Sequence, residues 1–164
     1  MLATTISETE SLFRSDPAKA QTRPTVTASL ANGRARLSAG PFNWDADLPG
    51  VLGGENLAPS PTAYLLGALA GCAVAFLRDT LAPQFGVELD DVTAVAKASS
   101  DLRGLIAIDG AAPDLADFDL DITISTGSTQ DRVDAMFEAW KARCPIYLAL
   151  LNPNAIALTI STAA

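Results

Sequence analysis

Strict alternation of apolar and polar residues predicts β-strands in several parts of the chain. The clearest segment is DFDLDITIS, residues 117–125, in which four large apolar side chains alternate with aspartates and small polar residues. Successive side chains of a strand point to opposite faces, so this segment predicts a strand with one apolar face and one face of aspartates. Weaker alternation predicts further strands over residues 42–47, 91–98, 104–108 and 155–161.

A β-hairpin is expected near the start of the chain. Residues 25–39 read TVTASLA, Asn32-Gly33 and RARLSA, so that an Asn-Gly pair lies between two alternating segments. Asn-Gly is the strongest short-range signal for a two-residue hairpin turn, because both residues tolerate a positive φ. With the strand over 42–47, the hairpin would form a meander.

A long apolar helix is predicted after the loop LPGVLGGENLAPSP, which is rich in glycine and proline. Ser60 is a natural N-cap, and Pro61 suits the first helical turn. The segment 63–77 is apolar on nearly every side. Such a helix must lie between layers, or between a sheet and a second subunit, and Gly67 and Gly71 would permit close approach of another backbone.

The C-terminal third predicts a second helix. Ser128 and Asp131 have the spacing of a capping box. Pro145 should interrupt this helix after Cys144 and begin a short one over 145–151, followed by a turn at 152–154. The apolar stripe that would face the core consists of Val133, Met136, Phe137, Trp140 and Cys144.

These elements predict an α+β fold in one domain, residues 25–164, preceded by a polar arm over residues 1–24. The chain has 164 residues, 49% of them hydrophobic and 18% charged, which is enough apolar surface for one core. Its net charge of −8 and scattered basic residues argue against nucleic acid as a partner. The arm lacks the features of a secretion signal and the run 63–77 is shorter than a membrane span, so we expect a cytoplasmic protein without a membrane partner.

The chain contains no histidine, which excludes Ser-His-Asp and Cys-His activation and removes the commonest ligand of transition metals. Two cysteines are too few for a closed four-thiolate zinc site, and the aspartates of 117–121 are expected to form a solvated face. We therefore expect no bound metal or cofactor. Chemistry, where present, would run through cysteine, carboxylate or lysine.

Cys72 and Cys144 are the two cysteines. Cys72 lies within the apolar helix, where burial would raise its pKa, and a small packing residue is the simpler interpretation. Cys144 precedes the helix expected at Pro145, where free backbone N–H groups favour a thiolate, although inert packing explains it equally well. A redox pair and an inert pair both remain open at this point.

The segments PSPTAYLLGALAGC and RCPIYLALL resemble the two cysteine-bearing segments of the OsmC/Ohr family, the osmotically inducible and organic-hydroperoxide-resistance proteins. The likeness extends from about Thr25 to Thr162, with Leu52-Gly53-Gly54 and Asp101-Leu102-Arg103-Gly104 among its features. It implies an intertwined homodimer whose long central helices are covered by sheets from both subunits. It also implies that Cys72 attacks an organic hydroperoxide, that Cys144 resolves the sulfenic acid as a disulfide, and that dihydrolipoamide or a similar external thiol reduces it.

Two positions depart from that family's pattern. The family places a Pro-Glu pair at the start of the cysteine helix, where this chain has Pro61-Thr62. The family's arginine, two residues before a glycine in the first hairpin turn, corresponds to Ala31, with Arg34, Arg36 and Arg103 as possible substitutes. The sequence thus supports two main hypotheses: a thiol-dependent peroxidase in stress defence, and a non-catalytic module that binds a hydrophobic small molecule. Other cysteine chemistry, such as thioester or sulfur transfer, would use the same two residues.

Overall fold

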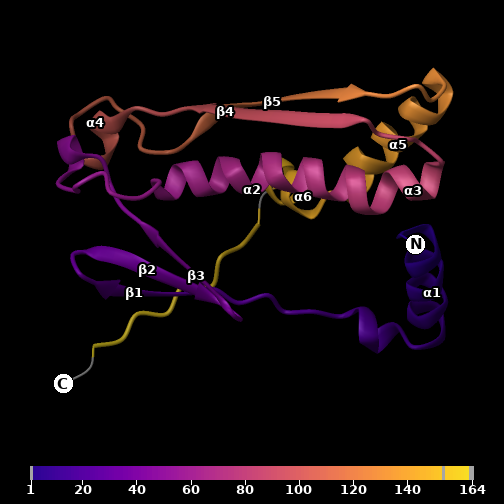
Figure 1. Ribbon diagram of the computed structural model, residues 1–164. Helices are drawn as coiled ribbons and strands as arrows, with labels where there is room; N and C mark the ends of the chain where they lie inside the picture. The colour runs from indigo at the N-terminus through magenta and orange to yellow at the C-terminus, as the bar shows by residue number, and fades with distance from the viewer. Residues whose placement is uncertain (1, 153, 163–164) are drawn as a thin grey trace.

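The computed structural model describes residues 2–152 and 154–162 as an α+β fold (Figure 1). A long helix, α2 (Pro61–Phe76), lies between two antiparallel sheets. The sheet of β4 (Asp91–Ser99) and β5 (Ala116–Ser125) covers one side of α2. The sheet of β1, β2 and β3 lies on the opposite side, near the start of the helix. This arrangement confirms the predicted α+β class.

The N-terminal meander forms as predicted. β1 (Thr27–Ala31) and β2 (Arg34–Ala39) pair through a turn in which Asn32 has φ 52° and Gly33 has φ 76°. Two consecutive positive φ values are the conformation that favours Asn-Gly in tight hairpins. β3 (Phe42–Ala46) pairs with β2, which confirms the third strand.

The helical stretch that begins at α2 covers residues 61–85 and is longer than the predicted apolar run over 63–77. Ser60 caps it by accepting the N–H of Ala63, as predicted. A π-turn, η3 (Leu77–Leu81), and the short α3 (Ala82–Phe85) continue it without a break. The 25 residues 61–85 are long and apolar enough to cross a membrane, so length alone does not exclude a span. A core helix meets the same criterion, and α2 packs here against β4 and β5.

One side of α2 is open in the single chain, so the expected cover on that side would have to come from a second subunit. Leu69 and Ala73 face the core and are buried. Gly67 and Gly71 are exposed, and a Cβ atom added at either would meet nothing within 4 Å. Within the described chain, therefore, nothing covers this face.

The strands β4 and β5 confirm the clearest alternation. Leu120, Ile122 and Ile124 are partly buried against the core, and Asp121 and Thr123 between them are exposed. Phe118, at the start of the predicted apolar face, is 39% exposed. The strand predicted over 104–108 is wrong, because a helical turn, α4 (Leu102–Leu105), forms there. Asp101 accepts the N–H of Arg103 and caps that turn.

The second helix is confirmed as α5 (Gln130–Arg143), and Pro145 begins α6 (Pro145–Leu151) as predicted. The capping box is wrong: Thr129 is the N-cap, and the Ser128 hydroxyl accepts the N–H of Glu88 instead. The predicted stripe forms the centre of the core, since Val133, Met136, Trp140 and Cys144 are buried and Phe137 packs against them.

Both ends of the chain differ from the prediction: the N-terminal arm contains a helix, and the C-terminal segment forms no strand. The N-terminal arm contains α1 (Leu2–Ser15) and a 3-10 turn, η1 (Pro17–Ala20), and α1 lies beside α3 (Figure 1). The loop before α2 contains another such turn, η2 (Gly50–Leu52). The closing strand predicted over 155–161 is not formed, although large aliphatic residues alternate with small ones along this segment. Ile156, Leu158 and Ile160 are exposed to 89%, 79% and 82%. Residue 153 of the predicted turn lies outside the described residues.

Candidate functional site

The fold brings the two cysteines together. Cys72 lies near the middle of α2, and Cys144 lies at the junction of α5 and α6. The thiols of Cys72 and Cys144 share a hydrogen bond, with the two Sγ atoms 3.4 Å apart. Both are free thiols, Cys72 half-buried and Cys144 with no exposed surface. A disulfide requires about 2.05 Å between its sulfur atoms, so closure needs only a small approach.

The surroundings of Cys72 hold it in the neutral form. Burial raises the pKa of the Cys72 thiol to about 11. The hydrogen bond to Cys144, and the repulsion that a second thiolate beside it would create, act in the same direction. The backbone N–H of Ile146 donates to the Cys72 sulfur and opposes this rise. No arginine or lysine of the described chain contributes to the shift.

The junction of α5 and α6 differs in one respect from the sequence interpretation. Cys144 is the N-cap residue of α6, as predicted, but its side chain makes no capping hydrogen bond. A free N–H of the first turn of α6 points instead at the sulfur of Cys72. The helix start therefore favours the thiolate of the other cysteine, an effect across the pair that spacing along the chain does not reveal.

The candidate supporting residues lie away from the cysteine pair in this chain. Arg36 and Arg34 both approach Asp45, at 3.0 and 3.9 Å. Arg103 forms a close ion pair with Asp101. Thr62 is exposed at the start of α2 and precedes Cys72 by ten positions, almost three helical turns. The single chain thus supplies neither a cation nor Thr62 to the sulfur.

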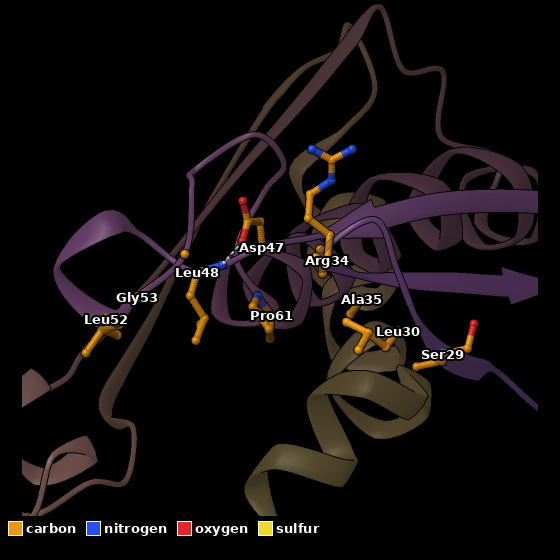
Figure 2. A pocket seen from close by; sticks show the side chains of 13 residues that line it. Ser29, Leu30, Arg34, Ala35, Asp47, Leu48, Leu52, Gly53 and Pro61 are labelled. Carbon is orange, nitrogen blue, oxygen red and sulfur yellow. Dashed lines mark hydrogen bonds between the residues drawn. The ribbon is translucent and has the colours of Figure 1, made fainter.

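A cleft of about 420 Å³ lies between the β1–β2 hairpin and the loop before α2 (Figure 2). Leu30 and Ala35 line its apolar side, and Pro61 lies at the start of α2. In Figure 2 the Arg34 side chain points away from Leu30 and Ala35, and its guanidinium lies on the same side of the cleft as the Asp47 carboxylate. The Arg34 Nε is buried and has no hydrogen-bond partner among the described residues. Of the three arginines, Arg34 is therefore the one with an unused donor beside a cleft.

Asp47 organises this cleft and was missed by sequence reasoning. Its carboxylate accepts the backbone N–H groups of Leu57, Leu48 and Glu55 at 3.0, 2.8 and 3.2 Å. These bonds, that from Leu57 first, lower the pKa of Asp47 despite the opposing effect of burial. An aspartate that precedes a loop rich in glycine and proline often accepts backbone N–H groups of that loop. This pattern in the sequence could have indicated the role of Asp47.

A family model for OsmC-like proteins matches residues 53–159, a span that contains both cysteines. The chain belongs to the OsmC-like protein family. No curated protein sequence matches it significantly. Several solved structures share the fold of this OsmC-like protein. An OsmC-like protein from Mycoplasma pneumoniae is 19% identical with a TM-score of 0.65, and the match covers 80% of this chain and 89% of that one.

Two further structures similar to this OsmC-like chain are organic hydroperoxide resistance proteins. The one from Elizabethkingia anophelis is 18% identical with a TM-score of 0.58, over 79% of this chain and 88% of that one. The one from Legionella pneumophila is 21% identical with a TM-score of 0.51, over 79% and 89%. At these identities the likeness shows the fold alone. In the described part of this family member, no group of three or more acidic or cysteine side chains could hold a metal ion.

Proposed function

We propose that this protein reduces organic hydroperoxides with Cys72 and Cys144 as a redox pair. The observation that carries the proposal is the 3.4 Å separation of the two sulfur atoms. Two solved structures with the same fold are organic hydroperoxide resistance proteins, which supports the substrate class. We infer a cytoplasmic location, because reduced thiols that regenerate the pair are available there.

The reaction has three balanced steps. The Cys72 thiolate attacks the outer oxygen of the hydroperoxide, the O–O bond breaks, and the departing alkoxide takes a proton to leave as an alcohol. Cys72 is thereby oxidised by two electrons to a sulfenic acid. The Cys144 thiol attacks the sulfenic sulfur, forming a disulfide and releasing water. A dithiol such as dihydrolipoamide then supplies two electrons and two protons, restoring both thiols and closing as its own disulfide.

The burial of the two cysteines supports this order of roles. Cys72 is half-buried, so a small hydroperoxide can approach its sulfur. Cys144 has no exposed surface, and its sulfur contacts that of Cys72. A resolving cysteine needs contact with the sulfenic acid and no access for the hydroperoxide, which is the position of Cys144.

A second copy of the chain would supply the charge that the single chain lacks. With its pKa raised to about 11, only about one Cys72 in ten thousand is a thiolate at pH 7. In a two-fold dimer with antiparallel α2 helices crossing at Gly67, residues at equal distances on either side of Gly67 lie opposite each other. Thr62 and Cys72 are such a pair. Arg34, beside the cleft at Pro61, would approach the Cys72 of the other copy.

Three exposed apolar surfaces support this homodimer. The open face of α2 has room for another backbone at Gly67 and Gly71. The first sheet exposes Leu30 and Phe42, and the C-terminal segment exposes three large aliphatic side chains. Large exposed apolar patches on a protein often mark interaction sites, and burying these surfaces against a second copy would stabilise the dimer.

The activity is tested by following the loss of cumene hydroperoxide with dihydrolipoamide as the reductant. We expect turnover that Cys72→Ser abolishes. Cys144→Ser should still consume one equivalent of peroxide and accumulate a sulfenic acid that dimedone labels. Arg34→Gln should lower the rate at least tenfold without changing the circular dichroism spectrum. Wild-type turnover no faster than that of Cys72→Ser would overturn the peroxidase proposal.

A non-catalytic module that binds a hydrophobic small molecule is the second candidate. The observation that favours it is the neutral setting of Cys72, with Thr62 in place of a carboxylate and no cation acting on the sulfur. This candidate predicts that purified protein carries an apolar molecule detectable by mass spectrometry, and that Cys72→Ser retains it. Absence of any such molecule, together with peroxide turnover, would exclude it.

A further inference from the structure

Two arginines and two aspartates form a charged cluster on one face of the first sheet. The register of β2 and β3 places Arg36 directly opposite Asp45. Continued by one residue, the same register places Arg34 opposite Asp47, and alternate residues of a strand share a face. The positive and negative charges of the cluster balance, so the role of each group depends on the partner that it holds.

The carboxylate of Asp45 is engaged by Arg36. The Arg36 Nη1 donates to the Asp45 Oδ1 at 3.0 Å. The Arg34 Nη2 lies 3.9 Å from the Asp45 Oδ2, which is too far for a hydrogen bond. The two guanidinium groups therefore compete for one carboxylate, and the arginine directly across the strand pair holds it.

The carboxylate of Asp47 is engaged by the backbone. It accepts three N–H groups of the loop before α2. The N–H of Leu57 contributes most to the lowered pKa of Asp47, and the charge of Arg34 is the smallest of the effects that lower it. Asp47 thus attracts Arg34 through charge alone, because no side-chain hydrogen bond to Arg34 contributes to this shift.

Arg34 is therefore the member of the cluster with an unused donor. Its side chain is 24% exposed, and its Nε is buried without a hydrogen-bond partner among the described residues. A buried donor left unpaired costs free energy, so this guanidinium is stabilised by any acceptor that comes within reach. The two nearby carboxylates keep it beside the cleft, although their oxygens are already bound to other groups.

We propose that Arg36 is a positioning residue for the redox pair, because by occupying Asp45 it leaves the guanidinium of Arg34 free. The free guanidinium then reaches the Cys72 sulfur of the second copy. This inference rests on the proposed function, in which Arg34 supplies the charge that Cys72 lacks within one chain. Without Arg36, Asp45 has no other cation and captures Arg34 by an approach of about 1 Å. The exposed pair of Arg36 and Asp45 itself adds little stability, so replacing Arg36 should leave the fold intact.

The rate at which iodoacetamide alkylates Cys72 tests this inference, because the thiolate is the reacting form. The rate is measured on the full chain at about pH 7 by mass spectrometry of the Cys72 peptide. Arg36→Gln should slow alkylation roughly threefold to tenfold, the result of a rise of about 0.5 to 1 in the pKa of Cys72. Arg36→Lys keeps a cation at Asp45 and should react within about twofold of the wild-type rate. Arg36→Gln combined with Asp45→Asn should also regain the wild-type rate, because Arg34 is then released.

Arg34→Gln separates this inference from the proposed function. In that variant, further replacement of Arg36 should not change alkylation. Slow alkylation of Arg34→Gln with a wild-type rate for Arg36→Gln would overturn the positioning role alone, as would a slow Arg36→Gln that Asp45→Asn does not restore. An unchanged rate in Arg34→Gln would overturn both the positioning role and the proposed charge at Cys72. The expected alkylation pattern without peroxide turnover would support the positioning role and overturn the peroxidase proposal.

Discussion

The sulfur atoms of Cys72 and Cys144 lie 3.4 Å apart, although one belongs to the middle of α2 and the other to the start of α6. The contact depends on the interruption at Pro145, which separates α5 from α6 and leaves Cys144 facing α2. The N–H of Ile146, one residue beyond the proline, also points at Cys72. The break in the helix thus places both the second thiol and a backbone donor beside the first.

Mild oxidation should link the two cysteines within one chain. We expect one equivalent of diamide to convert the native protein to a species that has lost two hydrogen atoms, with one disulfide-linked peptide pair after digestion. The short gap between the sulfurs favours this bond over a link between chains. Cys72→Ser and Cys144→Ser are the controls, and neither should lose the two hydrogens. Only intermolecular disulfides in the wild-type protein would contradict the prediction.

Alkaline pH should destabilise the wild-type protein through Cys72. Its pKa is raised from 9.0 to about 11 in the folded state. Between these values the unfolded thiol has lost its proton and the folded thiol keeps it, so the free energy of unfolding falls as pH rises through this window. In thermal melts from about pH 9 to about pH 11, the melting temperature of the wild type should therefore fall more steeply than that of Cys72→Ser. Other groups titrate alike in both proteins, and parallel curves would be inconsistent with the raised pKa.

The helices and strands were predictable where the turn or cap residues and the apolar pattern of the sequence both indicate the same element. Asn32-Gly33 specifies its hairpin because both residues accept a positive φ, and Ser60-Pro61 specifies the start of α2. The segment 104–108 failed because Asp101 caps a turn in competition with a weak strand pattern. The strand over 155–161 failed for another reason, since a strand needs a neighbour and this segment pairs with none in the described chain.

The site was predictable only in part. Both cysteines could be named from the family resemblance, but their contact is a property of packing between distant segments. The pairing of Arg34 and Arg36 with Asp45 also depends on strand register, which brings Arg36 opposite Asp45. The unpaired Nε of Arg34 had no sign in the sequence, where Arg34 appears as one of three possible substitutes for the family's arginine.

Gly54 is required by a close approach of two backbone segments. A Cβ atom there would lie 2.0 Å from the carbonyl oxygen of Leu48, whereas one at Gly50 would meet nothing within 4 Å. Gly54→Ala should therefore lower the free energy of unfolding by about 1–3 kcal/mol. Gly50→Ala, in the same loop, should change it little. Urea denaturation measures both, and equal stability of the two variants would show that the loop can move aside.

The C-terminal segment should contribute to association of two copies. Ile156, Leu158 and Ile160 alternate as in a strand but are almost fully exposed. Covering them on a second copy would bury three aliphatic side chains, each worth about 1.5–3 kcal/mol when fully buried. Replacing all three by serine should therefore weaken the dimer on the order of a hundredfold or more, as measured by sedimentation equilibrium.

The matched control for this prediction replaces the intervening residues Ala155, Ala157 and Thr159 by serine. These side chains alternate with the three aliphatic ones, so they would face away from the contact in a strand. The control should associate as the wild type does, within about threefold. A wild-type protein that remains monomeric at every concentration, or two variants that dimerise equally, would exclude this segment as part of the interface. A wild-type protein that remains monomeric would also remove the route by which Arg34 of one copy reaches Cys72 of the other.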